Sequence, residues 1–131
     1  MTDEERRYRF TTTSEELMNG KHLLVIHTTP ERGPGHDEEA WSQQYNDILP
    51  SVVSLDGIQS AQRFKLSTFQ VATILSPLPT PDEHQYLAIY EVDDPQQAAA
   101  VLAENAKRLG AHGTASSRSR YYDAISDRIV P

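Results

Sequence analysis

Hydrophobic and polar positions along the chain form two kinds of pattern, one typical of β-strands and one typical of helices. The strand pattern predicts four β-strands. Each predicted strand is rich in Leu, Val, Ile, Tyr or Thr and is separated from the next element by turn-forming residues. The predicted strands cover residues 22–29, 58–66 and 86–92 and part of 117–129, around Arg120–Tyr122. Residues 67–83 are apolar at first and proline-rich later, and we interpret them as an insertion with a short strand of its own.

Two other segments have helical periodicity. The first begins at the acidic residues 37–39, where a helix dipole favours negative charge, and its apolar stripe runs through Trp41 to Val52, with Pro50 expected to end or kink it. The second begins at Asp94–Pro95 and stops at Gly110. The resulting order predicts a ferredoxin-like βαββαβ fold of the α+β class, whose antiparallel sheet has both helices on one face.

Composition restricts the partners that such a domain would have. The length of 131 residues suits one domain, with residues 1–20 as a polar N-terminal extension and residues 21–131 as the ferredoxin-like domain. A net charge of −7 without a cluster of Lys or Arg argues against nucleic acid and anionic membranes as partners. The chain has no cysteine, no apolar leader and no apolar run long enough to span a bilayer, so we expect a cytoplasmic protein.

Several motifs, taken in order, resemble the EthD-like branch of the dimeric α+β barrel superfamily. They are Val25–Pro30, Trp41, Tyr45–Pro50, Gly57, Ser60–Phe64, Tyr86–Glu91 and Tyr121–Ile129, within a resemblance that covers residues 22–130. The resemblance implies a homodimer in which two ferredoxin-like sheets face each other, with a cavity between each sheet and its helices or loops. It implies no single activity, because the superfamily includes monooxygenases, cyclases, isomerases, dehydratases and proteins with no known reaction.

The chain departs from this family pattern at the end of the first predicted helix. Family members commonly carry a segment of the type Trp-Tyr-Asn-Asp-x-His-Leu-Pro. Here Gln44 stands at the tryptophan position, and no histidine precedes Leu49–Pro50. No acid or ligand role of that histidine can therefore be transferred to this chain.

Three polar residues are candidates for catalysis in such a cavity. His27 ends the first strand, and its imidazole would serve as a general acid or base; the alternative is a strand-end histidine bonded to backbone or water. The Tyr45 hydroxyl would orient a ligand oxygen. Arg63 would stabilise a carboxylate or enolate, and its alternative is an ion pair with Glu91 on a neighbouring strand.

Three aromatic residues are candidates for ligand binding. Tyr86 and Tyr90 share one face of a strand with Ala88 between them as a small gap, an arrangement that suits either an aromatic ligand or a dimer interface. Trp41 lies one helical turn from Tyr45, and core packing is its alternative role. No metal site and no cofactor are predicted, because no ligand pair has helical spacing and no phosphate-binding loop is present.

Two functions agree with these features. The first is a homodimeric protein that binds a small hydrophobic or aromatic, oxygen-bearing molecule, with cofactor-free proton-transfer chemistry such as cyclisation, isomerisation or dehydration. The second is a non-catalytic dimeric accessory or interaction protein. A cavity lined by polar groups would favour the first function, and a space filled by side chains would favour the second.

Overall fold

The computed structural model describes residues 22–80, 85–110 and 112–131. The N-terminal extension predicted for residues 1–20 lies outside these residues. The helices and strands are β1 (His22–Pro30), α2 (Glu38–Val53), β2 (Ile58–Lys65), β3 (Tyr86–Val92), α3 (Pro95–Glu104), α4 (Ala106–Leu109) and β4 (Thr114–Asp123). None of the helices in the described part of the chain is long and apolar enough to cross a membrane.

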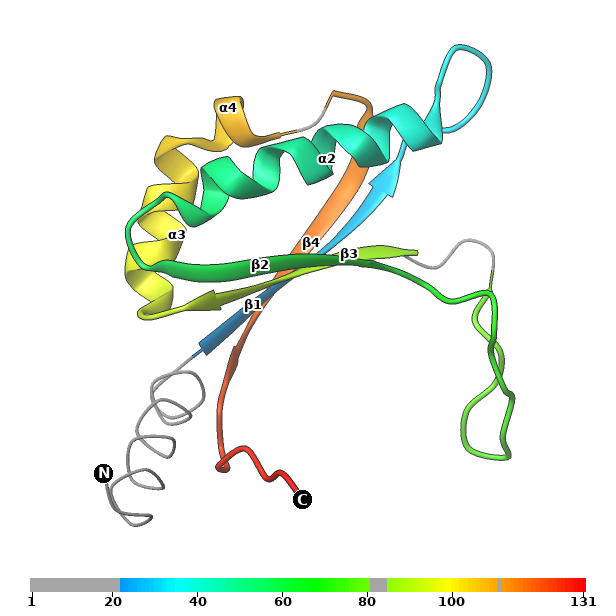
Figure 1. Ribbon diagram of the computed structural model, residues 1–131. Helices are drawn as coiled ribbons and strands as arrows, with labels where there is room; N and C mark the ends of the chain where they lie inside the picture. The colour runs from blue at the N-terminus through cyan, green and yellow to red at the C-terminus, as the bar shows by residue number, and fades with distance from the viewer. Residues whose placement is uncertain (1–21, 81–84, 111) are drawn as a thin grey trace.

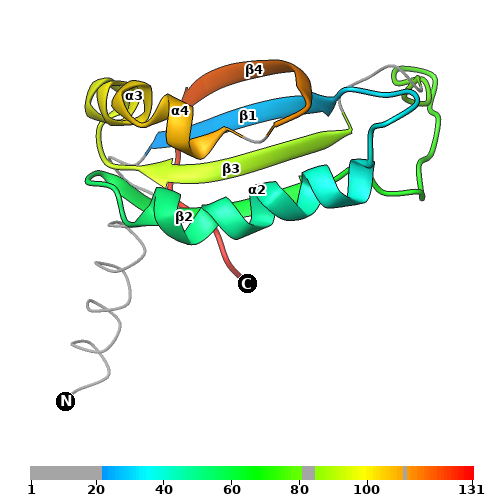
Figure 2. The ribbon, with the colours of Figure 1, turned by 90° about the horizontal axis from the view of Figure 1, so that it is seen from above.

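The four strands form one antiparallel sheet in the order β2-β3-β1-β4. The helices lie together on one face of it, with α2 running along the sheet and α3 and α4 gathered at one end (Figures 1 and 2). The predicted ferredoxin-like α+β fold is therefore confirmed.

The helices differ from the prediction in two places. α2 continues through Pro50 to Val53, so of the two outcomes expected at this proline, an end or a kink, the helix end is wrong. One lost hydrogen bond is offset there because Ile48, Leu49 and Val52 pack into the core on both sides of the proline. The second helix is divided at Asn105 into α3 and the short α4.

The strands differ less. β4 begins at Thr114, three residues before the predicted region, and ends at Asp123. The insertion between β2 and β3 contains no strand among its described residues, 66–80 and 85, so the short strand expected there is absent from this part. Its prolines and polar residues leave it without a partner strand in the sheet.

The core lies between the sheet and the helices. Residues alternate along β1 and β3, so Leu24, Ala88, Tyr90 and Val92 are buried on the helix side. The register of the sheet also aligns one row of side chains across all four strands, namely Arg63, Ala88, Ile26 and Ser119. Because two members of this row are small, space remains above the middle of the sheet.

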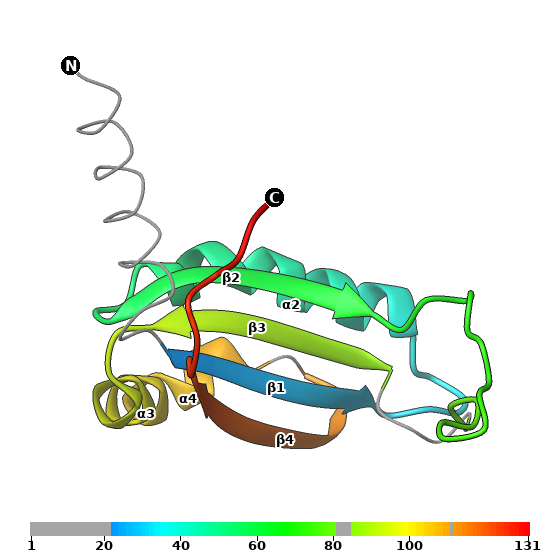
Figure 3. The same ribbon diagram turned by 90° about the horizontal axis from the view of Figure 1, so that it is seen from below.

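None of the described helices, α2, α3 and α4, covers the opposite face of the sheet (Figure 3). By alternation, this open face carries the half-buried apolar residues Leu23, Val25, Leu87 and Ile89. It also carries polar side chains between them and at its edge, which are His27, Glu91, Arg118 and Arg120. Apolar residues on an uncovered sheet face are typical of a surface that another molecule covers.

Candidate functional site

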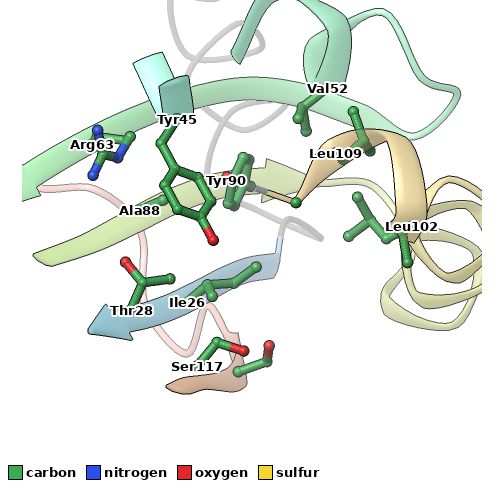
Figure 4. A pocket seen from close by; sticks show the side chains of 13 residues that line it. Ile26, Thr28, Tyr45, Val52, Arg63, Ala88, Tyr90, Leu102, Leu109 and Ser117 are labelled. Atoms are coloured by element: carbon green, nitrogen blue, oxygen red, sulfur yellow. The ribbon is translucent and has the colours of Figure 1, made fainter. Parts of the chain in front are cut away.

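A cavity of about 250 Å³ lies between the sheet and the helices, above the row of small residues (Figure 4). Its walls come from β1, β2, β3 and β4 and from all three helices. The lining residues named in the figure are Ile26, Thr28, Tyr45, Val52, Arg63, Ala88, Tyr90, Leu102, Leu109 and Ser117. Ser117 and Ser119 of β4 are exposed to solvent although they line the cavity, so it opens along this edge of the sheet.

The cavity has an apolar end and a polar end. Leu102 and Leu109 reach in from α3 and α4, and Val52 adds to them from α2. At the other end are hydroxyl groups, and the Tyr45 side chain points its hydroxyl toward β1 (Figure 4). The Tyr90 side chain is buried, yet no hydrogen bond joins its hydroxyl to the described part of the chain. This phenol is therefore available to a ligand oxygen.

Arg63 holds a guanidinium at the wall of the cavity. Its Nη1 donates hydrogen bonds to the backbone oxygen of Ser42 at 2.6 Å, to the Ser42 hydroxyl at 3.0 Å and to Oδ1 of Asn46 at 2.9 Å. Ser42 and Asn46 are one turn apart on α2, so these bonds fix the side chain against the helix. The other terminal nitrogen, Nη2, is buried and has no hydrogen-bond partner.

Aromatic rings surround the same guanidinium. Its central carbon lies 5.1 Å from the ring centre of Tyr45, 5.7 Å from that of Tyr86 and 5.8 Å from that of Trp41. These rings attract a cation but do not neutralise it. Burial away from water lowers the pKa of Arg63 from its ordinary value. Glu91, the predicted partner in the alternative interpretation, lies on the open face and forms no ion pair with it.

Trp41, Tyr45 and Tyr86 form a compact aromatic cluster beside the cavity. The rings of Trp41 and Tyr45 meet edge to face at 5.2 Å, and those of Trp41 and Tyr86 at 5.0 Å. The Trp41 indole N–H donates to Oγ1 of Thr114, which also lies 2.9 Å from the Tyr45 hydroxyl. Trp41 and Tyr86 are both almost fully buried, and of these three rings only Tyr45 lines the cavity.

The hydroxyl of Tyr86 is bonded within the protein. It donates a hydrogen bond of 2.7 Å to Oε2 of Glu38 at the start of α2. Burial, followed by this bond and the charge of Glu38, raises the pKa of Tyr86 to about 12. Burial also raises the pKa of Tyr90, against the opposing charge of Arg63. Both phenols are therefore neutral hydrogen-bond donors at physiological pH.

His27 lies apart from the other candidates. It stands between Ile26 and Thr28 in β1, and both of these neighbours line the cavity. Because side chains alternate along a strand, the His27 imidazole points to the open face of the sheet. The structure thus brings Tyr45, Arg63 and Tyr90 together at one cavity, with Trp41 and Tyr86 behind them, and places His27 on the other side.

Sequence reasoning did not identify the hydroxyls of Thr28, Ser117 and Ser119 as lining residues. The sequence gives little indication of this role, because a serine that lines a cavity from an edge strand has the same sequence pattern as a serine that only faces solvent. Ser42 and Asn46 were also missed, although their spacing of four residues on a predicted helix is the spacing of neighbours on one face. In the described part of the chain, no three His, Asp or Glu side chains come close enough together to hold a metal ion.

The fold is similar to that of solved structures with low sequence identity. An EthD-like protein from Ralstonia eutropha is 9% identical with a TM-score of 0.53, over 82% of this chain and 95% of that one. The cofactor-independent oxygenase SnoaB from Streptomyces nogalater is 14% identical with a TM-score of 0.50, also over 82% and 95%. A dimeric protein of ferredoxin-like fold from Bacteroides fragilis is 11% identical with a TM-score of 0.46, over 81% and 98%.

No protein-family model matches the sequence, and neither does any curated protein. The similarity is therefore one of structure. It shows that the chain shares the fold of these structures, and an EthD-like protein is among them, in agreement with the resemblance found in the sequence.

Proposed function

We propose that this protein binds a small, largely apolar, oxygen-bearing molecule in the cavity between its sheet and its helices. The proposal rests on the residues that line this cavity. Most of them are apolar, and the phenols of Tyr45 and Tyr90 and the guanidinium of Arg63 lie among them. Ligand sites are usually concave and mostly apolar, with a few polar groups that fix the orientation of the ligand. A protein without a ligand would be expected to fill this space, because protein interiors are close-packed.

The size of the cavity limits the ligand. An apolar cavity of roughly 150 Å³ is enough to hold benzene. A volume of about 250 Å³ therefore suits one substituted ring or a compact pair of rings. The opening beside Ser117 and Ser119 would let a larger molecule extend into solvent.

The chemistry we assign to this cavity is proton transfer without a cofactor. Tyr45 and Tyr90 would donate hydrogen bonds or a proton to a ligand oxygen, and Arg63 would stabilise the negative charge that develops there. Cyclisation, isomerisation and dehydration are reactions that such groups assist. His27 is not part of this proposal, because it faces the other side of the sheet.

We further propose that the protein is a homodimer built on the open face of the sheet. The half-buried apolar residues of that face support this, and so does the buried Oε2 of Glu91, which has no hydrogen-bond partner. Arg118 is exposed on the same face, so a second copy would bring a cation near this carboxylate. The face is thus complementary to itself in charge as well as apolar, as a twofold interface requires.

The insertion between β2 and β3 supports the same dimer. Residues 66–80, called the arm below, contain no charged residue. The arm and the C-terminal segment extend beyond the sheet on the side away from the helices (Figure 1). The large apolar side chains of the arm are exposed, and they are Leu66, Phe69, Val71, Ile74, Leu75 and Leu78. A second copy on the open face would lie between these segments and cover them.

Binding can be tested with a variant that fills the cavity. Ala88 lies in the middle of its floor, so Ala88→Leu should occupy the space that the ligand needs. A set of one-ring and two-ring phenols, ketones and carboxylates is added to isotope-labelled protein, and amide chemical shifts are recorded. We expect shifts at the lining residues of the natural protein and none in Ala88→Leu.

Ala99→Leu is the matched control, because Ala99 is exposed on α3 and does not line the cavity. It should respond to the compounds as the natural protein does. The proposal fails if no compound shifts the lining residues, or if Ala88→Leu binds as well as Ala99→Leu.

A further inference from the structure

Arg63 is a partly buried cation without a counter-ion among the described residues. All its hydrogen-bond acceptors are neutral oxygens, supplied by Ser42 and Asn46. No carboxylate of the described residues forms an ion pair with it. Charges taken out of water are normally paired, because the loss of hydration costs more than neutral partners return.

The cavity beside Arg63 is selective in charge. The chain has 19 acidic residues and a net charge of −7, yet none of the side chains that line the cavity is acidic. The lining contains one cation, several neutral hydroxyls and otherwise apolar groups. A cavity of this kind repels cations and offers an anion both a charge and hydrogen-bond donors.

We infer that the ligand binds as an anion, with a carboxylate, enolate or phenolate oxygen whose charge Arg63 compensates. This inference rests on the proposed function, since it concerns the same cavity. The guanidinium is held against α2 by the hydrogen bonds of Nη1. Its other terminal nitrogen, Nη2, is buried and has no hydrogen-bond partner among the described residues. Tyr90 supplies a second donor, since its hydroxyl also has no partner in the described part of the chain.

A purely structural role explains only part of this arrangement. The three bonds of Nη1 join β2 to α2, and the aromatic rings of Tyr45 and Tyr86 shield the group from water. Neither contact uses Nη2, and a structural arginine in such a position is ordinarily paired with a carboxylate. An anionic ligand beside the guanidinium accounts for the absence of an acidic partner among the described residues.

Matched pairs of compounds test the inference on the natural protein. Benzoate is compared with benzamide and 2-naphthoate with 2-naphthamide, which have nearly the same shape but differ in charge. Affinities are measured from amide chemical shifts, together with the Nε–H resonance of Arg63. We expect the acid to bind at least about tenfold more tightly than its amide, since a charge-assisted bond is stronger than a neutral one. We also expect the Arg63 resonance to move with the acid only.

Two variants assign the preference to one residue. Arg63→Gln should remove the preference for the acid, so that the acid and its amide bind with equal affinity. Lys65→Gln is the control, because Lys65 is exposed two residues along the same strand and lines a neighbouring cleft rather than the cavity. It removes an equal charge nearby and should leave the preference intact.

The outcomes separate the two proposals. If acid and amide bind the cavity equally well, the ligand is not selected as an anion, and the inference is wrong while the cavity remains a binding site. If Lys65→Gln abolishes the preference as Arg63→Gln does, general electrostatic attraction accounts for it and Arg63 has no special role. If neither member of any pair shifts the lining residues, the proposed function itself fails. Should Arg63→Gln not fold, the Arg63 resonance of the natural protein decides the matter.

Discussion

At the scale of single residues, environment rather than residue type separates the tyrosines of this protein. The Tyr86 hydroxyl donates a hydrogen bond to Glu38, and the buried Tyr90 lies beside Arg63 with no hydrogen bond from its hydroxyl to the described part of the chain. Tyr45 shares Thr114 with Trp41. Tyr86 and Tyr90 share one face of the same strand, so their different roles follow only from which groups the fold brings next to each hydroxyl. Tyr90 and Tyr45 line the cavity and are the phenols of the proposed function, whereas the hydroxyl of Tyr86 is bonded to Glu38.

The contact between Tyr86 and Glu38 predicts a late-ionising phenol. Because the pKa of Tyr86 is raised from 10 to about 12, the folded chain keeps this proton in a pH range in which the unfolded chain has lost it. The free energy of unfolding should therefore fall as the pH rises through this range. In a titration of phenolate absorbance, with circular dichroism to verify folding, Tyr86→Phe should lose the component near pH 12.

Tyr122→Phe provides the comparison, because Tyr122 is exposed at the end of β4. It should reduce the total absorbance change and leave the late component in place. A natural protein whose phenols have all ionised well below pH 12 would show that the bond to Glu38 is not maintained in solution.

At the scale of elements, the predictions that succeeded depend on local signals. The start of α3 is an example, since Asp94 accepts hydrogen bonds from the backbone N–H groups of Gln96 and Gln97, as an N-cap residue should. Pro50 shows the opposite case, in which packing of Val52 and its neighbours overrides a local signal. The cavity was neither predicted by a local signal nor produced against one. Its floor depends on the register that aligns Ser119 with Ile26 and Ala88, which no local pattern determines.

The cap of α3 gives a quantitative prediction. Asp94→Ala removes both hydrogen bonds and should lower the free energy of unfolding by about 1 kcal/mol. Asp94→Asn should change it far less, because an asparagine oxygen caps a helix about as well. Urea unfolding followed by circular dichroism measures both. Equal losses in the two variants would mean that the charge of Asp94, and not its capping oxygen, stabilises the helix.

At the scale of the whole molecule, the two faces of the sheet differ in their side chains and in what covers them. The helix side encloses the cavity with Arg63 and Tyr90, and the open side carries Leu23, Val25, Leu87 and Ile89. The sequence predicted both faces of β3 but not the face on which His27 lies, three residues before the end of β1 at Pro30. Its place on the open side puts it in the proposed interface, where it would lie near Arg118, its neighbour across the sheet.

Self-association on the open face is the last prediction. Light scattering at micromolar concentration should return twice the 14.7 kDa of the chain. Ile89→Asp places a charge in the middle of the open face and should shift the mass to that of a monomer, because an unpaired carboxylate would be buried on pairing. Val53→Asp makes the same change at the exposed end of α2, in the helical layer, and should remain dimeric.

A natural protein that stays a monomer would refute the dimer. A dimer that survives Ile89→Asp would place the interface elsewhere. The exposed apolar arm would then be the surface to change next, since it carries several exposed large apolar side chains and no charge.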